Sequence, residues 1–270
     1  MLLSGKIKIN TPSGTLSDAF QLPIQLPAVE KAVFCSLKIQ IQGTEYKNTY
    51  PLWISPAKKE MPTPANELKI FEKADSALFA HLANGGKALL MPAGNSYPDQ
   101  TVGGLFTSDY WNYSMFKSIS ENAKKPVSPG TMGLLIQNEH PLFDHFPTQT
   151  HSNWQWWPAV RNSHPLIIDR AAGKINPIVE SIDNVERVHR LATIFECKVG
   201  NGKLLVCMSD VRNSLHYKAN VQLYSAITTY LNSDSFNPID SISAALLKTL
   251  FTEKSAENNI QGVMNISYDE

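Results

Sequence analysis

Residues 68–92 constrain the fold of this chain most strongly. Residues 68–71 form a short apolar run of strand length, and residues 74–82 then place apolar side chains at helical spacing. Asn84-Gly85-Gly86 follows and is typical of a glycine C-cap, after which residues 87–92 form a continuous apolar run. A strand, a helix and a buried strand in this order make a βαβ unit. The segment therefore predicts a parallel sheet that helices cover on both faces.

The first 55 residues are predicted to form β structure, because apolar and polar side chains alternate along them. Residues 33–42 alternate strictly, Gly43-Thr44 forms a turn, and residues 46–54 alternate again. Residues 6–9 and 22–26 bring the expected total to about four strands. Four strands are few for an independent sandwich. We expect a small antiparallel β-sandwich segment of immunoglobulin-like type whose beginning is missing, and a complete small sheet is the alternative.

The pattern after residue 92 predicts further strands and helices. The expected strands are residues 133–137, 165–169, 177–182, 190–198 and 202–208, the last two forming a hairpin, and the expected helices are residues 214–231 and 242–251. A Pro- and Lys-rich stretch at residues 56–64 is typical of a linker. We therefore divide the chain into a β-sandwich segment (1–55), an α/β domain (56–235) and a C-terminal helix with a polar tail (236–270).

Composition excludes several classes of partner. The 24 Lys and Arg residues balance the 24 Asp and Glu residues, so the chain lacks the positive charge that binds nucleic acid or an acidic membrane surface. No apolar stretch approaches the roughly 20 residues that span a bilayer. The three cysteines are too few and too irregularly spaced for a disulfide framework or a zinc site. We therefore expect no metal, no cofactor, no nucleic acid and no membrane.

Catalytic signatures are absent from the sequence. It contains no G-x-S-x-G elbow, no P-loop, no G-x-G-x-x-G and no H-x-x-x-H or C-x-x-C pair. Cys207 ends an apolar run without a glycine-flanked elbow, which favours a structural role over a nucleophilic one. Glu180 and Asp183 are close in sequence, but a glycosidase pair needs a defined separation that sequence proximity does not establish. An enzyme that uses Cys207 or this carboxylate pair stays as an alternative.

Aromatic residues gather in two places. Tyr110, Trp111, Tyr113 and Phe116 form one cluster; Trp154, Trp156 and Trp157 form another, with His151 just before it. Such residues fill space in cores and domain interfaces, and tryptophan faces also stack on sugar rings. We favour the core, and we retain a carbohydrate-binding surface as the second hypothesis. Its candidate ligand-binding residues are Trp111, His151, Trp154, Trp156 and Trp157.

The order of several short segments resembles a known family. These are GTMGLLIQ (130–137), His140-Pro141, Phe146-Pro147-Thr148, NWQWW (153–157), Ile182-Asp183-Asn184, Phe195-Glu196 and GKLLV (202–206), with Tyr46-Lys47-Asn48, Leu52-Trp53-Ile54 and FTSDYWNYSMF (106–116) upstream. Together they resemble the C-terminal region of bacterial family 2 glycoside hydrolases of the β-galactosidase type, common in Bacteroidetes, over about residues 5–235.

This resemblance implies a fold and a role. The fold is a flavodoxin-like, mostly parallel doubly wound sheet, similar to class I glutamine amidotransferase domains without their catalytic cysteine. In such hydrolases the catalytic glutamates lie on a TIM barrel, which takes about 250 residues and has no place here. We therefore expect no catalytic residue in this chain, and a non-catalytic accessory or structural module in glycan breakdown.

The accessory role also implies partners and a location. The expected partner is a glycoside hydrolase catalytic domain or another subunit, with an oligosaccharide as a further ligand. The N-terminus MLLSGKIKIN lacks the apolar core of a signal peptide. A complete chain is therefore expected in the cytoplasm, and part of a secreted hydrolase is expected in the periplasm or at the cell surface.

Overall fold

The computed structural model describes residues 4–9, 12, 14, 16, 18, 20–57 and 68–255. The chain separates into two compact units, Met1–Lys58 and Lys59–Glu270. Most of the expected linker and the last 15 residues of the expected polar tail lie outside the described residues. We refer below to the first unit and the second unit.

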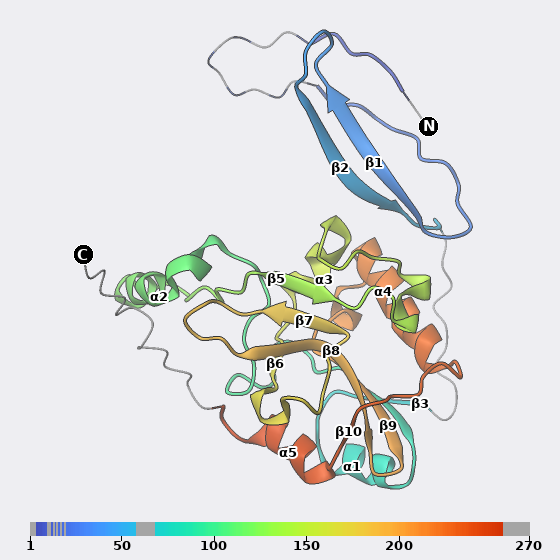
Figure 1. The fold of residues 1–270 in the computed structure, drawn as a ribbon, viewed down its shortest axis with the longest axis vertical. Helices are drawn as coiled ribbons and strands as arrows, with labels where there is room; N and C mark the ends of the chain where they lie inside the picture. The colour runs from blue at the N-terminus through green and yellow to red at the C-terminus, as the bar shows by residue number, and fades with distance from the viewer. Residues whose placement is uncertain are drawn as a thin grey trace, which may run out of the picture. The chain divides into compact units, whose positions relative to one another are not determined.

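The described part of the first unit contains one antiparallel hairpin (Figure 1). Strand β1 (Val33–Gln40) pairs with β2 (Lys47–Ile54) over its full length, from Val33 opposite Ile54 to Gln40 opposite Lys47. Gly43, which has a φ of 78°, lies in the connecting turn, where a residue with a Cβ would be strained. The two strands predicted from the alternating pattern are confirmed.

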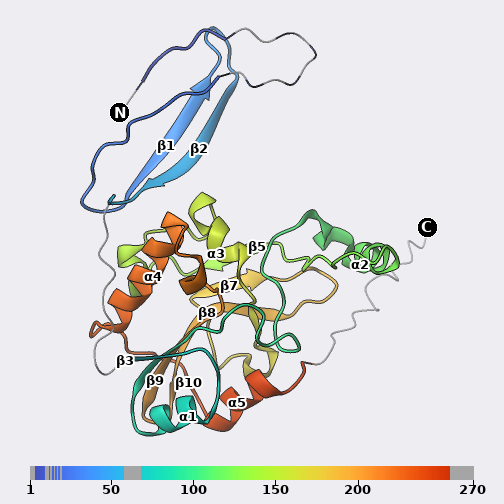
Figure 2. The ribbon, with the colours of Figure 1, turned by 180° about the vertical axis from the view of Figure 1, so that it is seen from behind.

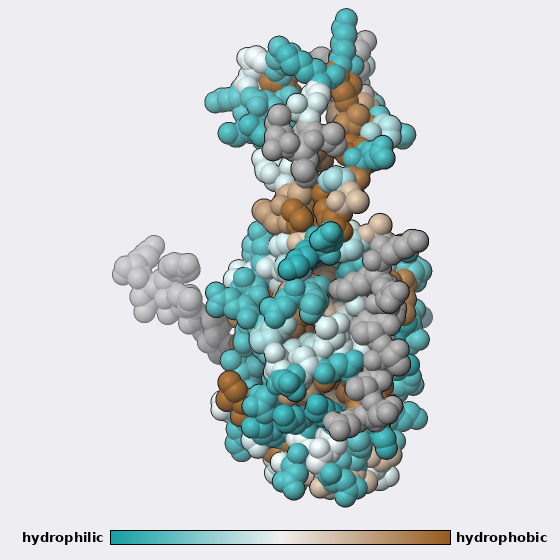
Figure 3. Space-filling model, turned by 90° about the vertical axis from the view of Figure 1, so that its right-hand side faces the viewer, coloured by the Kyte–Doolittle hydropathy of each residue, from teal (hydrophilic) through white to brown (hydrophobic). Residues whose placement is uncertain are grey.

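The predicted immunoglobulin-like sandwich is wrong. Residues 6–9 and 22–26 belong to the described part of the chain and form no strand there. Pro23 lies inside the second run and Pro27 follows it, and proline has no N–H to donate to a strand ladder. The hairpin carries apolar side chains at its surface (Figure 3). Phe34, Ile39 and Leu52 are among those exposed.

The second unit is built on a mixed sheet of eight strands. These are β3 (Leu68–Phe71), β4 (Lys87–Leu90), β5 (Gly133–Ile136), β6 (Leu166–Ile167), β7 (Val179–Ile182), β8 (Arg190–Val199), β9 (Gly202–Cys207) and β10 (Ser241–Ile242). The main order is β3-β4-β9-β8-β7-β5, and β6 and β10 pair with the two ends of the long strand β8. Strands β3, β4 and β9 are mutually parallel, whereas β9, β8, β7 and β5 alternate in direction.

The expected flavodoxin-like, mostly parallel sheet is therefore wrong. Strands β8 and β9 are joined by a tight turn at Gly200, and such a turn can only join antiparallel neighbours. Strand β7 reaches β8 through residues 183–189, which are too few for the crossover of about a dozen residues that a parallel pair requires. The same hairpin that the sequence predicted thus prevents the doubly wound arrangement.

Helices cover both faces of the sheet (Figures 1 and 2). Strand β4 shows the division, because Leu89 packs with α3 (Trp157–Arg161) and α4 (Lys218–Leu231), whereas Leu90 packs with α1 (Ser76–Ala83) and α5 (Ala244–Thr252). Helix α2 (Tyr113–Asn122) has no buried residue. None of the helices in the described ranges is long and apolar enough to cross a bilayer.

Several short elements connect this framework. They are the 3-10 helices η1 (Ser108–Asn112), η2 (Pro141–His145), η3 (Trp154–Trp156), η4 (Asp169–Ala171) and η5 (Arg212–Ser214). The C-terminal segment contributes β10 and α5 to the second unit. Loops that follow β4 and β9 emerge at the same edge of the sheet, because the two strands are parallel.

Candidate functional site

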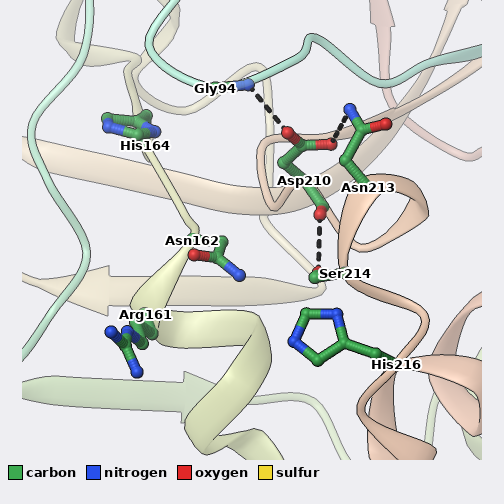
Figure 4. Close-up of a pocket in the computed structure, with 8 residues that line it drawn as sticks. All are labelled: Gly94, Arg161, Asn162, His164, Asp210, Asn213, Ser214 and His216. Carbon is green, nitrogen blue, oxygen red and sulfur yellow. Dashed lines mark hydrogen bonds between the residues drawn. The ribbon is translucent and has the colours of Figure 1, made fainter.

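A polar pocket of about 310 Å³ lies where these loops emerge (Figure 4). Four segments line it: the loop after β4, the end of α3 with the residues that follow it, the loop after β9, and η5 with the residues between η5 and α4. The lining residues are Gly94, Arg161, Asn162, His164, Asp210, Asn213, Ser214 and His216. Ligands of open α/β sheets bind in this position, outside the carboxyl ends of the strands.

Two antiparallel segments, residues 162–164 and 208–210, hold one part of the pocket in place. The backbone N–H groups of His164 and Asp210 each donate to a carbonyl of the opposite segment, at 2.8 and 3.1 Å. The buried hydroxyl of Ser209 donates to a carbonyl of α3 at 2.6 Å. Hydrogen bonds between the two backbone segments and to α3 therefore hold this part of the lining in a fixed position.

Asp210 is the single carboxylate in the lining, and both of its oxygens are occupied. Oδ2 accepts from the backbone N–H of Gly94 at 3.0 Å, and Oδ1 accepts from the amide of Asn213 at 2.9 Å (Figure 4). Gly94 has a φ of 51°, a left-handed conformation that favours glycine. The Ser214 hydroxyl donates to the Asp210 carbonyl at 2.8 Å and accepts from the buried Asn220 amide at 2.7 Å. Asp210 thus ties the loops after β4 and β9 together.

Hydrogen-bond donors dominate the rest of the lining. Arg161 makes no ion pair or hydrogen bond within the part of the chain that the structure describes. Burial lowers the pKa of His164 below its ordinary value, and the negative charge of Asp210 opposes this only in part. His164 is therefore neutral at pH 7, and its buried Nδ1 has no hydrogen-bond partner among the described residues. The groups that the pocket offers to a ligand are therefore the Arg161 guanidinium and the other ring nitrogen of His164, Nε2.

The three tryptophans of the second aromatic cluster differ in how far they are exposed to solvent. Trp156 is 1% exposed, packs edge-on against Phe143 and Phe146, and donates its indole N–H to the Thr148 hydroxyl at 2.7 Å. Trp154, by contrast, is 69% exposed on η3, and Trp157 is 49% exposed at the start of α3.

Trp157 lies next to the pocket. It precedes Arg161 by four residues on α3, and residues at this spacing share one face of a helix with Cβ atoms about 5–6 Å apart. The other face of α3 is buried through Pro158, Ala159 and Val160. The exposed face of α3 therefore carries an indole followed by a pocket-lining guanidinium.

The remaining predicted ligand-binding residues lie on other elements. Trp111 is 58% exposed on η1 and contacts Phe116 edge-on. His151 is exposed and forms an isolated bridge with Leu135 of β5. Neither residue lines the pocket, so the structure does not bring the five predicted residues together at that site.

The two enzyme alternatives find no support in the geometry. Cys207 is fully buried, and burial raises the pKa of its thiol to about 12. The Asp183 carboxylate accepts hydrogen bonds from the Arg187 guanidinium and from the backbone N–H groups of Asn184 and His189. Glu180 lies 3.5 Å from Arg190. Cys207 thus belongs to the core at the end of β9, and the two carboxylates bind arginines near β7 and β8.

Thiol labelling tests this assignment. In the native protein at about pH 8 we expect Cys35, which is half-buried, to react with DTNB, and Cys197 and Cys207 to resist because both are buried as neutral thiols. One thiol per chain should react before denaturation and three after it. A rapidly reacting second thiol that Cys207→Ser removes would contradict the buried assignment.

Sequence reasoning missed the pocket. A usable signal was present, since the chemistry of such sheets is expected at strand carboxyl ends, and Asp210 follows β9 by three residues. Nothing in the sequence indicated that residues 161–164 would join it, because that contact depends on the antiparallel segments. The described residues contain no group of three or more His, Cys, Asp or Glu side chains that could hold a metal ion.

A second hollow of about 340 Å³ lies at Gln137, Asn138, Glu139 and His140. Its lining comes from a single continuous turn, whereas the pocket described above gathers groups from several elements. Convergence of polar groups is what characterises a binding site, so we take the pocket at Asp210 as the candidate.

Comparison with protein families assigns both units. Residues 69–252 match the model of a domain of unknown function, DUF8487. The chain belongs to the DUF8487 family. The DUF8487 match contains every residue of the pocket and of α3. Residues 1–56 match a second domain of unknown function, DUF8488, and coincide with the first unit. A comparison with curated proteins gives no match.

Proposed function

We propose that this protein is a non-catalytic accessory module of glycan breakdown and that its second unit binds carbohydrate. One observation carries the proposal: the exposed indole of Trp157 stands one helical turn from a pocket whose polar groups converge from four elements. An indole face is apolar and flat, and it suits the apolar face of a sugar ring. The pocket supplies the polar partners that a sugar's hydroxyl groups need.

The chemistry of the pocket favours binding over catalysis. Its one carboxylate, Asp210, accepts hydrogen bonds from Gly94 and Asn213 and so connects the loops after β4 and β9. Cys207 and Asp183, the residues of the enzyme alternatives, are buried and engaged elsewhere. A binding role is also consistent with the accessory position that the resemblance to family 2 glycoside hydrolases implies.

We propose further that the first unit contacts a partner, either a glycoside hydrolase catalytic domain or another subunit. The support is the set of apolar side chains that one face of its hairpin exposes, including Val33, Ile39 and Leu52. Exposed apolar side chains that gather on one face of a sheet are typical of interaction surfaces. Both edges of this two-stranded sheet are unpaired among the described residues, which is a second reason to expect a covering partner.

Calorimetric titration with neutral and acidic oligosaccharides of plant and host glycans tests the carbohydrate proposal. We expect Trp157→Ala to weaken binding of the preferred sugar at least about 10-fold, because truncating one stacked aromatic costs about 1–2 kcal/mol. Trp111→Ala is the matched control, since Trp111 is exposed to a similar extent but lies on η1 and does not line the pocket. Equal losses in both variants, or no binding of any sugar by the native protein, would overturn the proposal.

A further inference from the structure

We infer that the pocket selects sugars that carry a carboxylate, such as the uronic acid units of acidic polysaccharides, and that Arg161 binds the carboxylate. The inference rests on the proposed carbohydrate-binding function and specifies its ligand class. It follows from the balance of charge in the lining, from the unused groups there, and from their position beside Trp157.

The balance of charge favours an acidic ligand. Asp210 is the only acidic residue in the lining, and its two oxygens already accept from Gly94 and Asn213. Arg161 is the only lining residue with a fixed positive charge, and it has no acidic partner in the described ranges. A guanidinium presents two parallel N–H groups, which match the two oxygens of a carboxylate.

His164 adds a requirement for a hydroxyl group. Its Nδ1 is closed to solvent, so Nε2, which makes no hydrogen bond with the described residues, is the ring nitrogen that a ligand can reach. A neutral imidazole has one nitrogen that donates and one that accepts, and a hydroxyl group can form a hydrogen bond with either. A ligand that has both a carboxylate and hydroxyl groups satisfies Arg161 and His164 together, whereas a simple anion satisfies only Arg161.

The position of Trp157 makes the two interactions compatible. Trp157 and Arg161 lie at the two ends of the same exposed helix face. A sugar ring stacked on the indole would therefore present a substituent to the guanidinium about one helical turn away. In Figure 4 Arg161, Asn162 and His164 stand on one side of the pocket, and Asp210, Asn213 and His216 stand on the other.

The test compares sugars that differ in one group. Calorimetric titrations of the full chain would use oligogalacturonides and neutral galactose oligomers of the same length, together with a sulfated galactose oligomer. We expect the oligogalacturonide to bind at least about 10-fold more tightly than the neutral oligomer, because a charge-assisted bidentate contact is stronger than a hydrogen bond between neutral groups. The sulfated oligomer should bind more weakly than the oligogalacturonide, because sulfate lacks the planar carboxylate geometry.

Variants of Arg161 make the test specific. Arg161→Gln should abolish the preference for the acidic sugar, so that the acidic and the neutral oligomer bind the variant with about the same affinity. Arg170→Gln is the control, because it removes the same charge at an exposed site outside the pocket. Neutral sugars that bind as tightly as acidic ones, with Trp157→Ala weakening both, would overturn this inference and leave the carbohydrate proposal standing. Tighter binding of the sulfated oligomer would also overturn it, and no sugar binding at all would overturn both.

Discussion

Replacement of Trp156 with alanine is expected to lower the free energy of unfolding of the second unit by about 3–5 kcal/mol. The indole is 1% exposed and is enclosed by Phe143 and Phe146, so its removal leaves a cavity among aromatic rings. The change also removes the donor to the Thr148 hydroxyl, whose side chain is buried with it. The loss therefore combines lost burial, lost edge-on ring contacts and an unpaired hydroxyl group.

Trp154→Ala is the matched control for this prediction. Trp154 belongs to the same short helix η3 but is 69% exposed, so its truncation should change the free energy of unfolding by no more than about 0.5 kcal/mol. Urea unfolding followed by far-UV circular dichroism would measure both values. Similar small losses in the two variants would show that Trp156 is not part of the core.

Arg187→Ala should have the second largest effect, a loss of about 3 kcal/mol. The Asp183 side chain is 2% exposed, and Arg187 donates to it from Nε at 3.0 and 3.1 Å and from Nη2 at 2.6 Å. Without Arg187 the carboxylate keeps only its two backbone donors and stays buried as an uncompensated charge. The variant also loses the bond from Nη2 to the Pro129 carbonyl and the contact of the guanidinium with the Tyr113 ring.

An exposed ion pair supplies the comparison. Arg170 contacts Glu253, and both side chains are more than one-third exposed, so Arg170→Ala should cost at most about 1 kcal/mol. Guanidinium chloride would screen the pairs, so the unfolding should be measured in urea at low salt. If Arg187→Ala cost no more than Arg170→Ala, Asp183 would not depend on its partner, and the carboxylate would again be a candidate for chemistry.

Local structure could be predicted from the sequence where one pattern determines it. The βαβ unit at residues 68–92 formed as expected, with Asp75 capping α1 and Gly85 in the left-handed conformation after it. The hairpin of β8 and β9 was predicted from two strand-length segments that a turn through Gly200-Asn201-Gly202 joins. These elements depend on residues that are close in sequence, so their signals are local.

The arrangement of the sheet could not be predicted in the same way. The βαβ unit indicates parallel strands, and the resemblance to the hydrolase family implied that the whole sheet follows, yet β8 and β7 reverse direction because their connections are short. In the first unit, residues 22–26 have the apolar content of a strand, but Pro23 and Pro27 prevent regular pairing. The direction of β7 and β8 is thus set by the length of their connections, whereas the prediction of a mostly parallel sheet came from the family resemblance.

The pocket was not predicted, although Trp157, one of the five candidate ligand-binding residues, lies one helical turn from it. The Trp-rich segment was identified, but residue type alone could not separate the buried Trp156 from its exposed neighbours. The pocket residues Arg161, His164 and Asp210 come from segments about 50 residues apart, and the antiparallel contact that joins them has no sequence signature. A site assembled from distant loops becomes visible only when the fold is known.

The most direct test of the central claim is ¹⁹F NMR of the protein labelled with 5-fluorotryptophan and titrated with an oligogalacturonide. The five tryptophans give separate resonances, which single Trp→Phe variants assign. The account predicts that the sugar shifts the Trp157 resonance in a saturable manner, while the resonances of Trp53 and Trp111 stay in place. A spectrum that does not change with any acidic or neutral sugar, or one in which only Trp111 responds, would contradict the assignment of the pocket beside α3 as a carbohydrate site.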